Sequence, residues 1–474
     1  MTSLLRIAQR TAKFCDPHDC TDNSDVQALL EAVFDAPVRR DGAGRFVPAL
    51  ATSWENTEQG RVWSLNLRER VSFHDGSAFD ATVMRACLER MQREDIGATL
   101  GAPAVWRQYL GGAEIKETGS HSLEIRLREP IADLLDILVS AYALPPSLMD
   151  AEGFMAAPIG TGAYRVERIE GEAAIILRRN SDWWGESAAA EEVQFLAEPD
   201  ETVRREMVAS GKAEIATRLS PAASAEERIL YQDPTSIIFL LNSAIEPLSD
   251  NRVRKALSLL LDRSSMIEEV LNGAGVPLLN IVSNAHFGVK SDASDGKPDV
   301  AAAKQLISEA GYADGMELTV YCPTKLPDQA QQLTALLGEQ LAAAGIKLQV
   351  RLEEDRVLYA ETVRAKNISN LCVFDSSPMS TFRVLYEKID SRVKGSWWQG
   401  FQSEAVEALL DTARTEADQQ AREGLYAQAL TALRDDPPWL TLYTQTFEAS
   451  STIGDASGAF RPDGVLDVSL LSTG

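Results

Sequence analysis

Apolar and polar residues alternate in several short segments of the first half of the chain. Val62–Leu67 reads VWSLNL, and this alternation predicts a half-buried strand. The same pattern predicts strands at Leu5–Ala8 and Leu123–Leu127, whereas the apolar residues of Ser236–Leu241 favour a fully buried strand. The apolar spacing of Ala81–Met91 predicts an amphipathic helix. The first half therefore combines strands with helices.

The second half is richer in helical periodicity. Gln329–Ala344 has the spacing of an amphipathic helix, and Gly345 is a suitable C-terminal cap. Strands are predicted on either side of it, at Glu317–Tyr321 and Lys347–Leu352, and another at Trp439–Tyr443. Further helices are predicted at Arg252–Leu261, Ser264–Leu271, Val300–Ala310, Glu404–Ala417 and Ala421–Arg434. The strand–helix–strand order indicates an α/β domain.

Length and charge limit the classes of protein to consider. A chain of 474 residues exceeds what one hydrophobic core usually supports, so two or three domains are expected. None of its apolar stretches approaches the roughly 20 residues that span a bilayer. The formal charge of −24 disfavours nucleic acids and anionic membrane surfaces as partners. The N-terminal sequence MTSLLRIAQRTAKF lacks the apolar core of a signal peptide.

The residues that usually carry catalysis are scattered. The four histidines, His18, His74, His121 and His286, share no metal-ligand spacing, and each is interpreted as a surface or turn residue. The sequence contains no nucleophile elbow, no P-loop and no dinucleotide fingerprint. We therefore expect no enzyme activity, no cofactor and no metal site.

The five cysteines give no metal motif either, since none is spaced as Cys-x-x-Cys. Cys15 and Cys20 are close enough in sequence for a disulfide if the chain turns there, and free thiols are the alternative. Gly76, Gly160 and Gly162 are expected to set turns.

Four segments in order resemble one family. Residues 40–81 contain Pro-Ala-Leu-Ala, an alternating strand and a Phe-His-Asp-Gly turn, and residues 158–186 contain Gly-Thr-Gly-x-Tyr and a closing Trp-Trp-Gly. Residues 240–273 carry Asn, Asp and a helix with Val-Arg-x-Ala, and residues 426–445 form the fourth segment. Together they resemble family 5 of the bacterial extracellular solute-binding proteins, the peptide, nickel and oligosaccharide group that serves ABC importers.

The resemblance implies an α/β, periplasmic-binding-protein-like fold, with two α/β lobes, hinge strands and an extra inserted domain. The hinge strands would be residues 236–241 and 439–443. The domains would be a first lobe of residues 1–30, 157–236 and 444–474, an inserted domain of residues 31–156, and a second lobe of residues 237–443.

The implied function is that of the substrate-binding component of an ABC importer. Such a protein captures a small polar solute in the cleft between its lobes by hinge closure, and delivers it to the permease subunits in the membrane. We expect a monomer, located in the periplasm or outside the cell, with its signal peptide removed. The alternative is a cytoplasmic ligand-sensing module of the same fold.

The family also indicates where the first lobe and the inserted domain would meet a ligand. In the loop after the opening strand, at residues 16–25, the candidates are Cys20, Thr21 and Asp22, with a solvated turn as the alternative. In the inserted domain the candidates are Trp106, Arg107 and Tyr142. Arg107 could pair with a ligand carboxylate, or it could be an arginine on a helix surface.

The second lobe would contribute the loop at residues 370–382. Peptide-binding members carry Asp-Pro-Asp here, whereas this chain has Ser377-Pro378-Met379, with Asp375 two residues earlier as a substitute. The nickel-binding branch has a histidine after this loop, whereas this chain has Trp397 and Trp398. Adjacent indoles suit a sugar ring or a flat apolar group. The expected ligand is zwitterionic, peptide-like or sugar-like.

Overall fold

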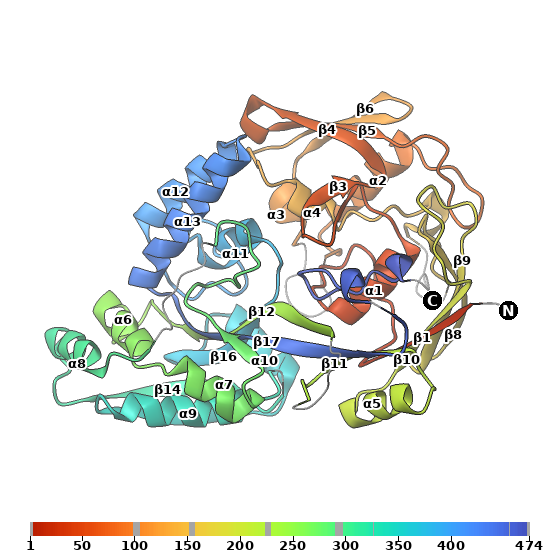
Figure 1. The fold of residues 1–474 in the computed structure, drawn as a ribbon. Helices are drawn as coiled ribbons and strands as arrows, with labels where there is room; N and C mark the ends of the chain where they lie inside the picture. The colour runs from red at the N-terminus through yellow and green to blue at the C-terminus, as the bar shows by residue number, and fades with distance from the viewer. Residues whose placement is uncertain are drawn as a thin grey trace. The chain divides into compact units, whose positions relative to one another are not determined.

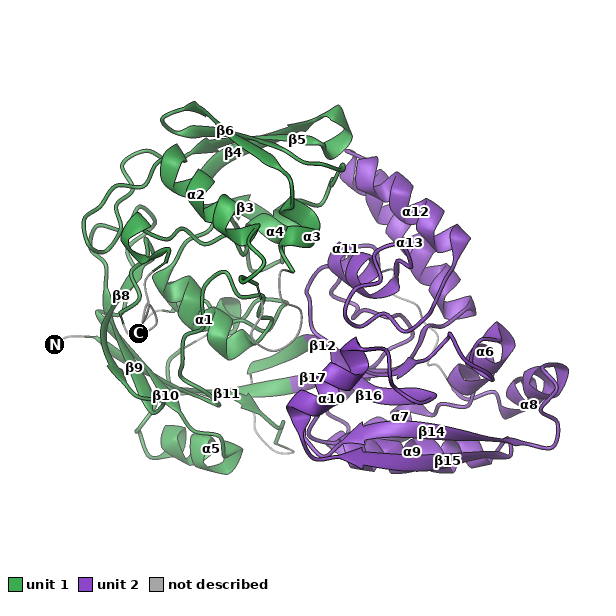
Figure 2. Ribbon diagram, turned by 180° about the vertical axis from the view of Figure 1, so that it is seen from behind, with its two compact units in different colours: residues 1–233, 447–474 green, residues 234–446 purple. Residues whose placement is uncertain are grey.

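The protein divides into two compact units, which Figure 2 distinguishes by colour. The structure is a computed structural model that describes residues 3–97, 105–150, 157–222, 229–289, 297–325, 327–454 and 456–471. Unit 1 comprises residues 1–233 and 447–474, and unit 2 comprises residues 234–446. The chain enters unit 2 in strand β12 (Ile229–Leu241) and leaves it in strand β17 (Trp439–Ser451).

Unit 1 contains a mixed sheet in the strand order β11-β1-β10-β9-β8. Strand β1 pairs in parallel with β10 and β11, whereas β9 is antiparallel to both of its neighbours. Ala8, Val208, Ala216 and Leu219 form a small apolar cluster between this sheet and helix α5. The elements are β1 (Leu4–Gln9), β8 (Tyr164–Glu170), β9 (Ala174–Arg179), β10 (Glu192–Ala197), β11 (Ile215–Leu219), α1 (Ser24–Val33) and α5 (Glu201–Ala209).

A second, antiparallel sheet of unit 1 has the order β4-β5-β7-β6, and β2 and β3 form a separate ribbon. Trp63 on β5 is buried, and its indole donates hydrogen bonds to the carbonyl oxygens of Gly60 and Ile131. The elements are β2 (Val38–Arg40), β3 (Phe46–Pro48), β4 (Ala51–Thr57), β5 (Val62–Leu67), β6 (Glu114–Gly119), β7 (Ser122–Arg126), α2 (Ala81–Met91), α3 (Arg107–Leu110) and α4 (Leu135–Leu138).

Unit 2 has an α/β core. Strand β14 pairs in parallel with β15 and β16, and helix α9 connects β14 to β15. Strand β12 is antiparallel to β16, and β13 pairs with β17 (Figure 1). The elements besides β12 and β17 are β13 (Gly275–Pro277), β14 (Met316–Pro323), β15 (Ile346–Glu353), β16 (Leu371–Ser376), α6 (Asn251–Leu259), α7 (Arg263–Leu271), α8 (Val300–Glu309), α9 (Ala330–Ala342), α10 (Arg356–Arg364), α11 (Thr381–Val384), α12 (Glu404–Thr415) and α13 (Gln419–Asp435).

Most of the predicted elements of unit 2 are confirmed, because helices α6 to α9 present a regular apolar stripe to one large core. Phe239, Leu257, Leu333, Val373 and Leu442 come from five different elements and are all buried in that core. The left-handed backbone of Gly345, with φ of 76°, ends the turn after α9 as its type predicts. The α/β character predicted for this half is therefore confirmed.

Two segments that were noted in the sequence interlock in unit 1. Nε2 of His74 bonds the Gly162 carbonyl oxygen at 3.1 Å. The Gly160 amide donates to Nδ1 of His74 at 3.3 Å, and the Gly160 carbonyl oxygen accepts from the His74 backbone amide at 2.9 Å. A side chain at Gly160 would place its Cβ 2.0 Å from the carbonyl oxygen of Val33, at the end of α1. Gly76 sets a turn, with φ of 86°, but Gly160 and Gly162 are needed for close packing and not for a turn.

Arg218 contacts both strands that connect the units, on the unit 1 side. Its guanidinium donates to the Asp233 carboxylate at 2.6 Å and lies 4.2 Å from the centre of the Phe447 ring. Asp233 and Phe447 are the residues of unit 1 at which β12 leaves it and β17 returns. One side chain therefore fixes both connections to the body of unit 1.

Candidate functional site

The loop between β1 and α1 is held in unit 1 by a buried histidine. Nε2 of His18 donates to the Tyr142 carbonyl oxygen at 2.8 Å, and Nδ1 accepts from Arg90 at 3.0 Å. The Trp106 indole donates to the carbonyl oxygen of His18 at 2.6 Å. Because burial and the Arg90 charge both disfavour an imidazolium, the pKa of His18 falls to about 4. His18 lies in a turn, as one of the two interpretations of the histidines expected. It is not a surface residue, because its side chain is fully buried.

The same arginine fixes the start of the loop. Arg90 pairs through two nitrogens with the Asp16 carboxylate, and this pairing helps to hold the pKa of Asp16 below its usual value against the effect of burial. Farther along, the Cys20 amide donates to the Gly97 carbonyl oxygen at 2.5 Å. The Thr21 carbonyl oxygen accepts from the Gln27 side chain on α1. The loop is therefore anchored at both ends.

The three loop candidates lie in this anchored segment. Cys20, Thr21 and Asp22 are all half-buried. Cys15 and Cys20 are both free thiols. Burial and the nearby Asp16 and Asp19 raise the pKa of the Cys15 thiol to about 12, so Cys15 remains a neutral thiol near pH 7. A rigid polar loop with half-exposed groups has the character of a ligand-contacting segment.

The inserted-domain candidates differ in their surroundings. Trp106 and Tyr142 are buried, with 1% and 6% of their surface exposed. The Trp106 indole bonds the His18 carbonyl oxygen, whereas the Tyr142 carbonyl oxygen bonds the His18 ring. The Tyr142 ring lies 6.2 Å from that of Phe34. Arg107 lies on the surface at the start of α3 and pairs with the exposed Glu94. The structure thus brings Trp106 and Tyr142 to the loop that carries Cys20, and places Arg107 in a surface ion pair.

In unit 2, Asp375 is the fifth residue of strand β16 and is half-buried. It pairs in register with Ile237 of β12. The Ser377-Pro378-Met379 segment follows directly, and the Pro378 carbonyl oxygen accepts from the buried His286 ring at 2.9 Å. The next turn is fixed by Thr381, whose hydroxyl donates to the Phe287 carbonyl oxygen at 2.5 Å.

Trp397 and Trp398 lie in a loop whose backbone is held by Lys366. Nζ of Lys366 donates to the carbonyl oxygens of Gly395 at 2.6 Å and Ser396 at 2.7 Å. The Trp397 ring lies 4.6 Å from that of Phe374, the neighbour of Asp375 on β16. Nε1 of Trp398 donates to the Phe401 carbonyl oxygen at 2.7 Å. Since burial lowers the pKa of Lys366 to about 8, this tether combines two strong hydrogen bonds with a poorly solvated charge.

Strand geometry relates Asp375 to the tryptophan loop. Neighbouring side chains of a strand point to opposite faces, so Asp375 and Phe374 leave β16 on different sides. Trp397 contacts Phe374 and therefore approaches β16 on the Phe374 face. Trp397 therefore contacts the residue next to Asp375 in β16, but Trp397 and Asp375 lie on opposite faces of the strand.

Sequence reasoning missed a group of charged side chains after β16. Arg383, Glu387 and Lys388 are buried, with less than a tenth of their surface exposed. Nε of Arg383 donates to Glu387 at 3.0 Å, and Nζ of Lys388 donates to the Ser376 hydroxyl at 3.0 Å. Buried charges require partners, so this group is a built polar feature of the unit. Its sequence, FRVLYEKID, alternates charged and apolar residues as an exposed helix would, and this concealed its burial.

No cluster of three or more histidine, cysteine or acidic side chains suited to a metal ion occurs among the residues that the structure describes. None of the helices in this described part of the chain is long and apolar enough to cross a membrane.

Comparisons with known proteins agree with this architecture. The chain is 23% identical over 499 aligned positions to a dipeptide-binding protein of Escherichia coli (strain K12), with 94% of this chain and 91% of the relative covered. It is 21% identical to a glutathione-binding protein of Salmonella paratyphi A, with 91% and 86% covered. The solved structure of HbpA2 from Haemophilus parasuis matches with a TM-score of 0.81 at 18% identity, covering 98% of each chain.

The family model of the bacterial extracellular solute-binding proteins, family 5, matches residues 45–372, which is more than half of the chain. The match covers three of the four segments on which the resemblance was based, in whole or in large part. This family is one of binding and transport proteins, which present solutes to ABC importers and are periplasmic. The chain belongs to family 5 of the bacterial extracellular solute-binding proteins.

Proposed function

We propose that this chain captures a small zwitterionic solute related to peptides and delivers it to the permease of an ABC importer. Both units contribute polar groups to solute capture, which proceeds by hinge closure through the two connecting strands, as family membership leads us to expect. The observation that carries the proposal is one anchored polar segment in each unit: the loop at residues 16–22 in unit 1, and residues 375–398, from the end of β16 to the tryptophan pair, in unit 2. Each segment is fixed by buried hydrogen bonds, as a preorganised binding site requires.

The ligand chemistry is inferred from the groups in these segments. The relatives are described as binding dipeptides and glutathione, which share an amino group and carboxylates. Asp375 supplies an anion for a ligand amino group, in place of the Asp-Pro-Asp pattern of peptide-binding members. Trp397 and Trp398 supply flat apolar surface in the same unit, on the Phe374 side of β16 in the case of Trp397. We propose a peptide-like or sugar-like zwitterion rather than an ordinary dipeptide or a bare metal ion.

The identity of the solute is the first thing to measure. Mass spectrometry of small molecules released from the purified, denatured protein should find a compound that carries both an amino and an acidic group. Release of only uncharged compounds would contradict the proposed ligand class.

Calorimetry with that compound then tests the site. Asp375→Ala should weaken binding by about 1–3 kcal/mol, the usual result of losing a charged hydrogen-bond partner. Trp397→Ala should weaken binding through lost apolar contact. Glu361→Ala, which removes an exposed carboxylate of α10, is the matched control and should bind as the parent does. If both site variants bind like this control, the assignment of the site is wrong.

We also propose that the chain works outside the cytoplasm, and that its precursor carries an export signal. Family membership supports this location. Cell fractionation of the native source should recover the protein in the periplasmic or extracellular fraction, and recovery in the cytoplasm would favour the alternative, a ligand-sensing module of the same fold.

A further inference from the structure

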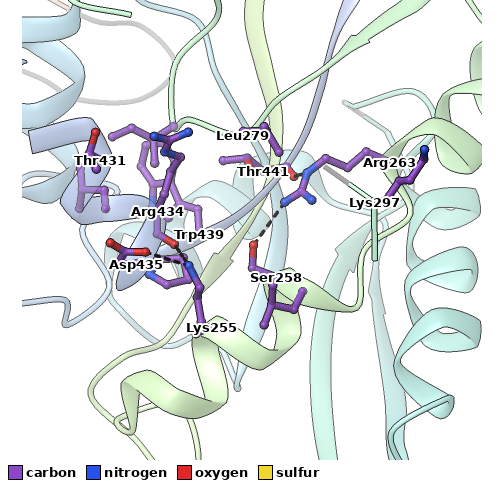
Figure 3. A pocket seen from close by; sticks show the side chains of 14 residues that line it. Lys255, Ser258, Arg263, Leu279, Lys297, Thr431, Arg434, Asp435, Trp439 and Thr441 are labelled. Carbon is purple, nitrogen blue, oxygen red and sulfur yellow. Dashed lines mark hydrogen bonds and ion pairs between the residues drawn. The ribbon is translucent and has the colours of Figure 1, made fainter. Parts of the chain in front are cut away.

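A pocket of about 290 Å³ lies entirely within unit 2, apart from the proposed solute site. Figure 3 shows it between α6, the start of α7, the end of α13 and β17. Lys255, Ser258 and Leu259 of α6 share one helix face and line one side. The residues around the remaining wall include Arg263, Lys297, Arg434, Asp435, Trp439 and Thr441.

Arg263 is the unusual feature of this pocket. Only 4% of its surface is exposed, yet its guanidinium has no carboxylate partner in the described part of the chain. Nε donates to the Thr441 carbonyl oxygen at 2.7 Å, and one terminal nitrogen donates to the Ser258 hydroxyl at 3.3 Å. The other terminal nitrogen makes no hydrogen bond to any described residue. Burial lowers the pKa of Arg263 to about 10, which reflects a cation without a counter-ion.

The neighbouring charges increase this excess. Nζ of Lys255 donates to the Arg434 carbonyl oxygen at 2.8 Å and to the Asp435 carboxylate at 3.1 Å. Among the described residues of the lining, Asp435 is the acidic one, and its side chain is 78% exposed. Lys297 and Arg434 add two more basic residues to the wall. In a chain of formal charge −24, the described lining thus gathers four basic residues, among them Arg263, whose guanidinium lacks a carboxylate partner in the described part of the chain.

We propose that this pocket binds a small oxyanion that carries two or more carboxylate or phosphate oxygens. The anion accepts hydrogen bonds from Arg263 and Lys255 and supplies the counter-charge that the buried guanidinium lacks. A guanidinium presents a planar pair of donors that matches a carboxylate or a phosphate. The volume suits an ion of the size of orthophosphate or citrate. It is too small for a peptide or an oligonucleotide of several residues.

Calorimetric titration of the full chain with orthophosphate, and separately with citrate, tests this proposal at constant ionic strength. The two probes distinguish a phosphate site from a carboxylate site. Lys255→Gln should weaken binding of the preferred anion at least tenfold, whereas Lys304→Gln, an equal change of charge on the exposed face of α8, should change it less than twofold. Arg263→Lys retains the charge but loses the planar donors, and should also weaken binding at least tenfold.

Saturable binding that depends on Lys255 and not on Lys304 supports the site. Absence of saturable binding for both probes, or equal weakening in the two lysine variants, overturns it. If circular dichroism shows that Arg263→Lys does not fold, the comparison of Lys255→Gln with Lys304→Gln tests the site without it. Asp375→Ala should bind the anion as the parent does, so a failure of the solute site and a failure of the anion site give different results.

Discussion

His18 connects three parts of unit 1 that lie far apart in the sequence. Its ring bonds Arg90 and the backbone of Tyr142, and its carbonyl oxygen accepts from Trp106. Both ring nitrogens are engaged only when the imidazole is neutral, because an imidazolium would present a proton to the Arg90 guanidinium. Protonation would therefore loosen the loop that carries Cys20, Thr21 and Asp22.

The low pKa of His18 predicts a loss of stability in mild acid. The group has an ordinary pKa of 6.5 when unfolded and about 4 when folded, so the unfolded chain binds more protons between these values. Its contribution is fully present above about pH 6.5 and is lost as the pH falls towards 4, by an amount on the order of 3 kcal/mol. Urea unfolding at pH 7 and pH 5 should show about 2 kcal/mol of this loss, because pH 5 lies between the two pKa values. His18→Gln, which has no titrating ring, should lose clearly less stability over this interval, and an equal loss would contradict the assignment.

The sequence could not reveal this network. Arg90 and Tyr142 lie 72 and 124 residues from His18, and a lone histidine in a loop gives no sign of such partners. The candidate residues Trp106 and Tyr142 were chosen from the family, and the structure shows them as buried supports of the loop. Asp375, Trp397 and Trp398 remain predictions as ligand contacts.

At the scale of elements, the end of α1 is packed against the Gly160–Gly162 segment. The amide of Gly162 donates to the Val33 carbonyl oxygen at 2.9 Å, and His74 holds the same segment from the other side. The helix, the turn and the glycine segment therefore form one packed group with no room for a side chain.

This packing predicts opposite effects for two glycine substitutions. Gly160→Ala places a methyl group 2.0 Å from the Val33 carbonyl oxygen and should destabilise the protein by about 3 kcal/mol. Gly424→Ala lies inside α13 with open space around its Cβ, and should stabilise it by about 0.5–1 kcal/mol through helix propensity. Thermal melting compares them, and similar melting temperatures would contradict the close packing.

Periodicity predicted elements well where one face of each is buried. Val62–Leu67 and Ala81–Met91 match β5 and α2 residue for residue, because their alternation and helical spacing reflect a single buried face. The strand predicted at Ser236–Leu241 begins at Ile229. Its first half, ILYQDPT, continues into unit 1, and Gln-Asp-Pro interrupts the apolar pattern there. The roles of Gly160 and Gly162 were missed because close approach, unlike a turn, leaves no local signature.

At the scale of the whole molecule, the proposed closure predicts a change in size. The two units are connected only through β12 and β17 within the described chain, and Arg218 fixes both strands on the unit 1 side. Small-angle X-ray scattering should give a smaller radius of gyration at saturating solute than without it. The anion titrated at the unit 2 pocket should leave the radius unchanged. An unchanged radius with bound solute would contradict the closure.

The division of the chain also sets the order in which the units can be completed during synthesis. Unit 2 is one continuous segment, whereas unit 1 needs residues from both ends. Glu31 on α1 pairs with the buried Arg461, 430 residues later, and Arg205 pairs with Glu448. Because synthesis adds about 5–20 residues per second, Arg461 is made roughly 20–90 s after its ion-pair partner Glu31. Unit 1 is begun first on the ribosome and finished last.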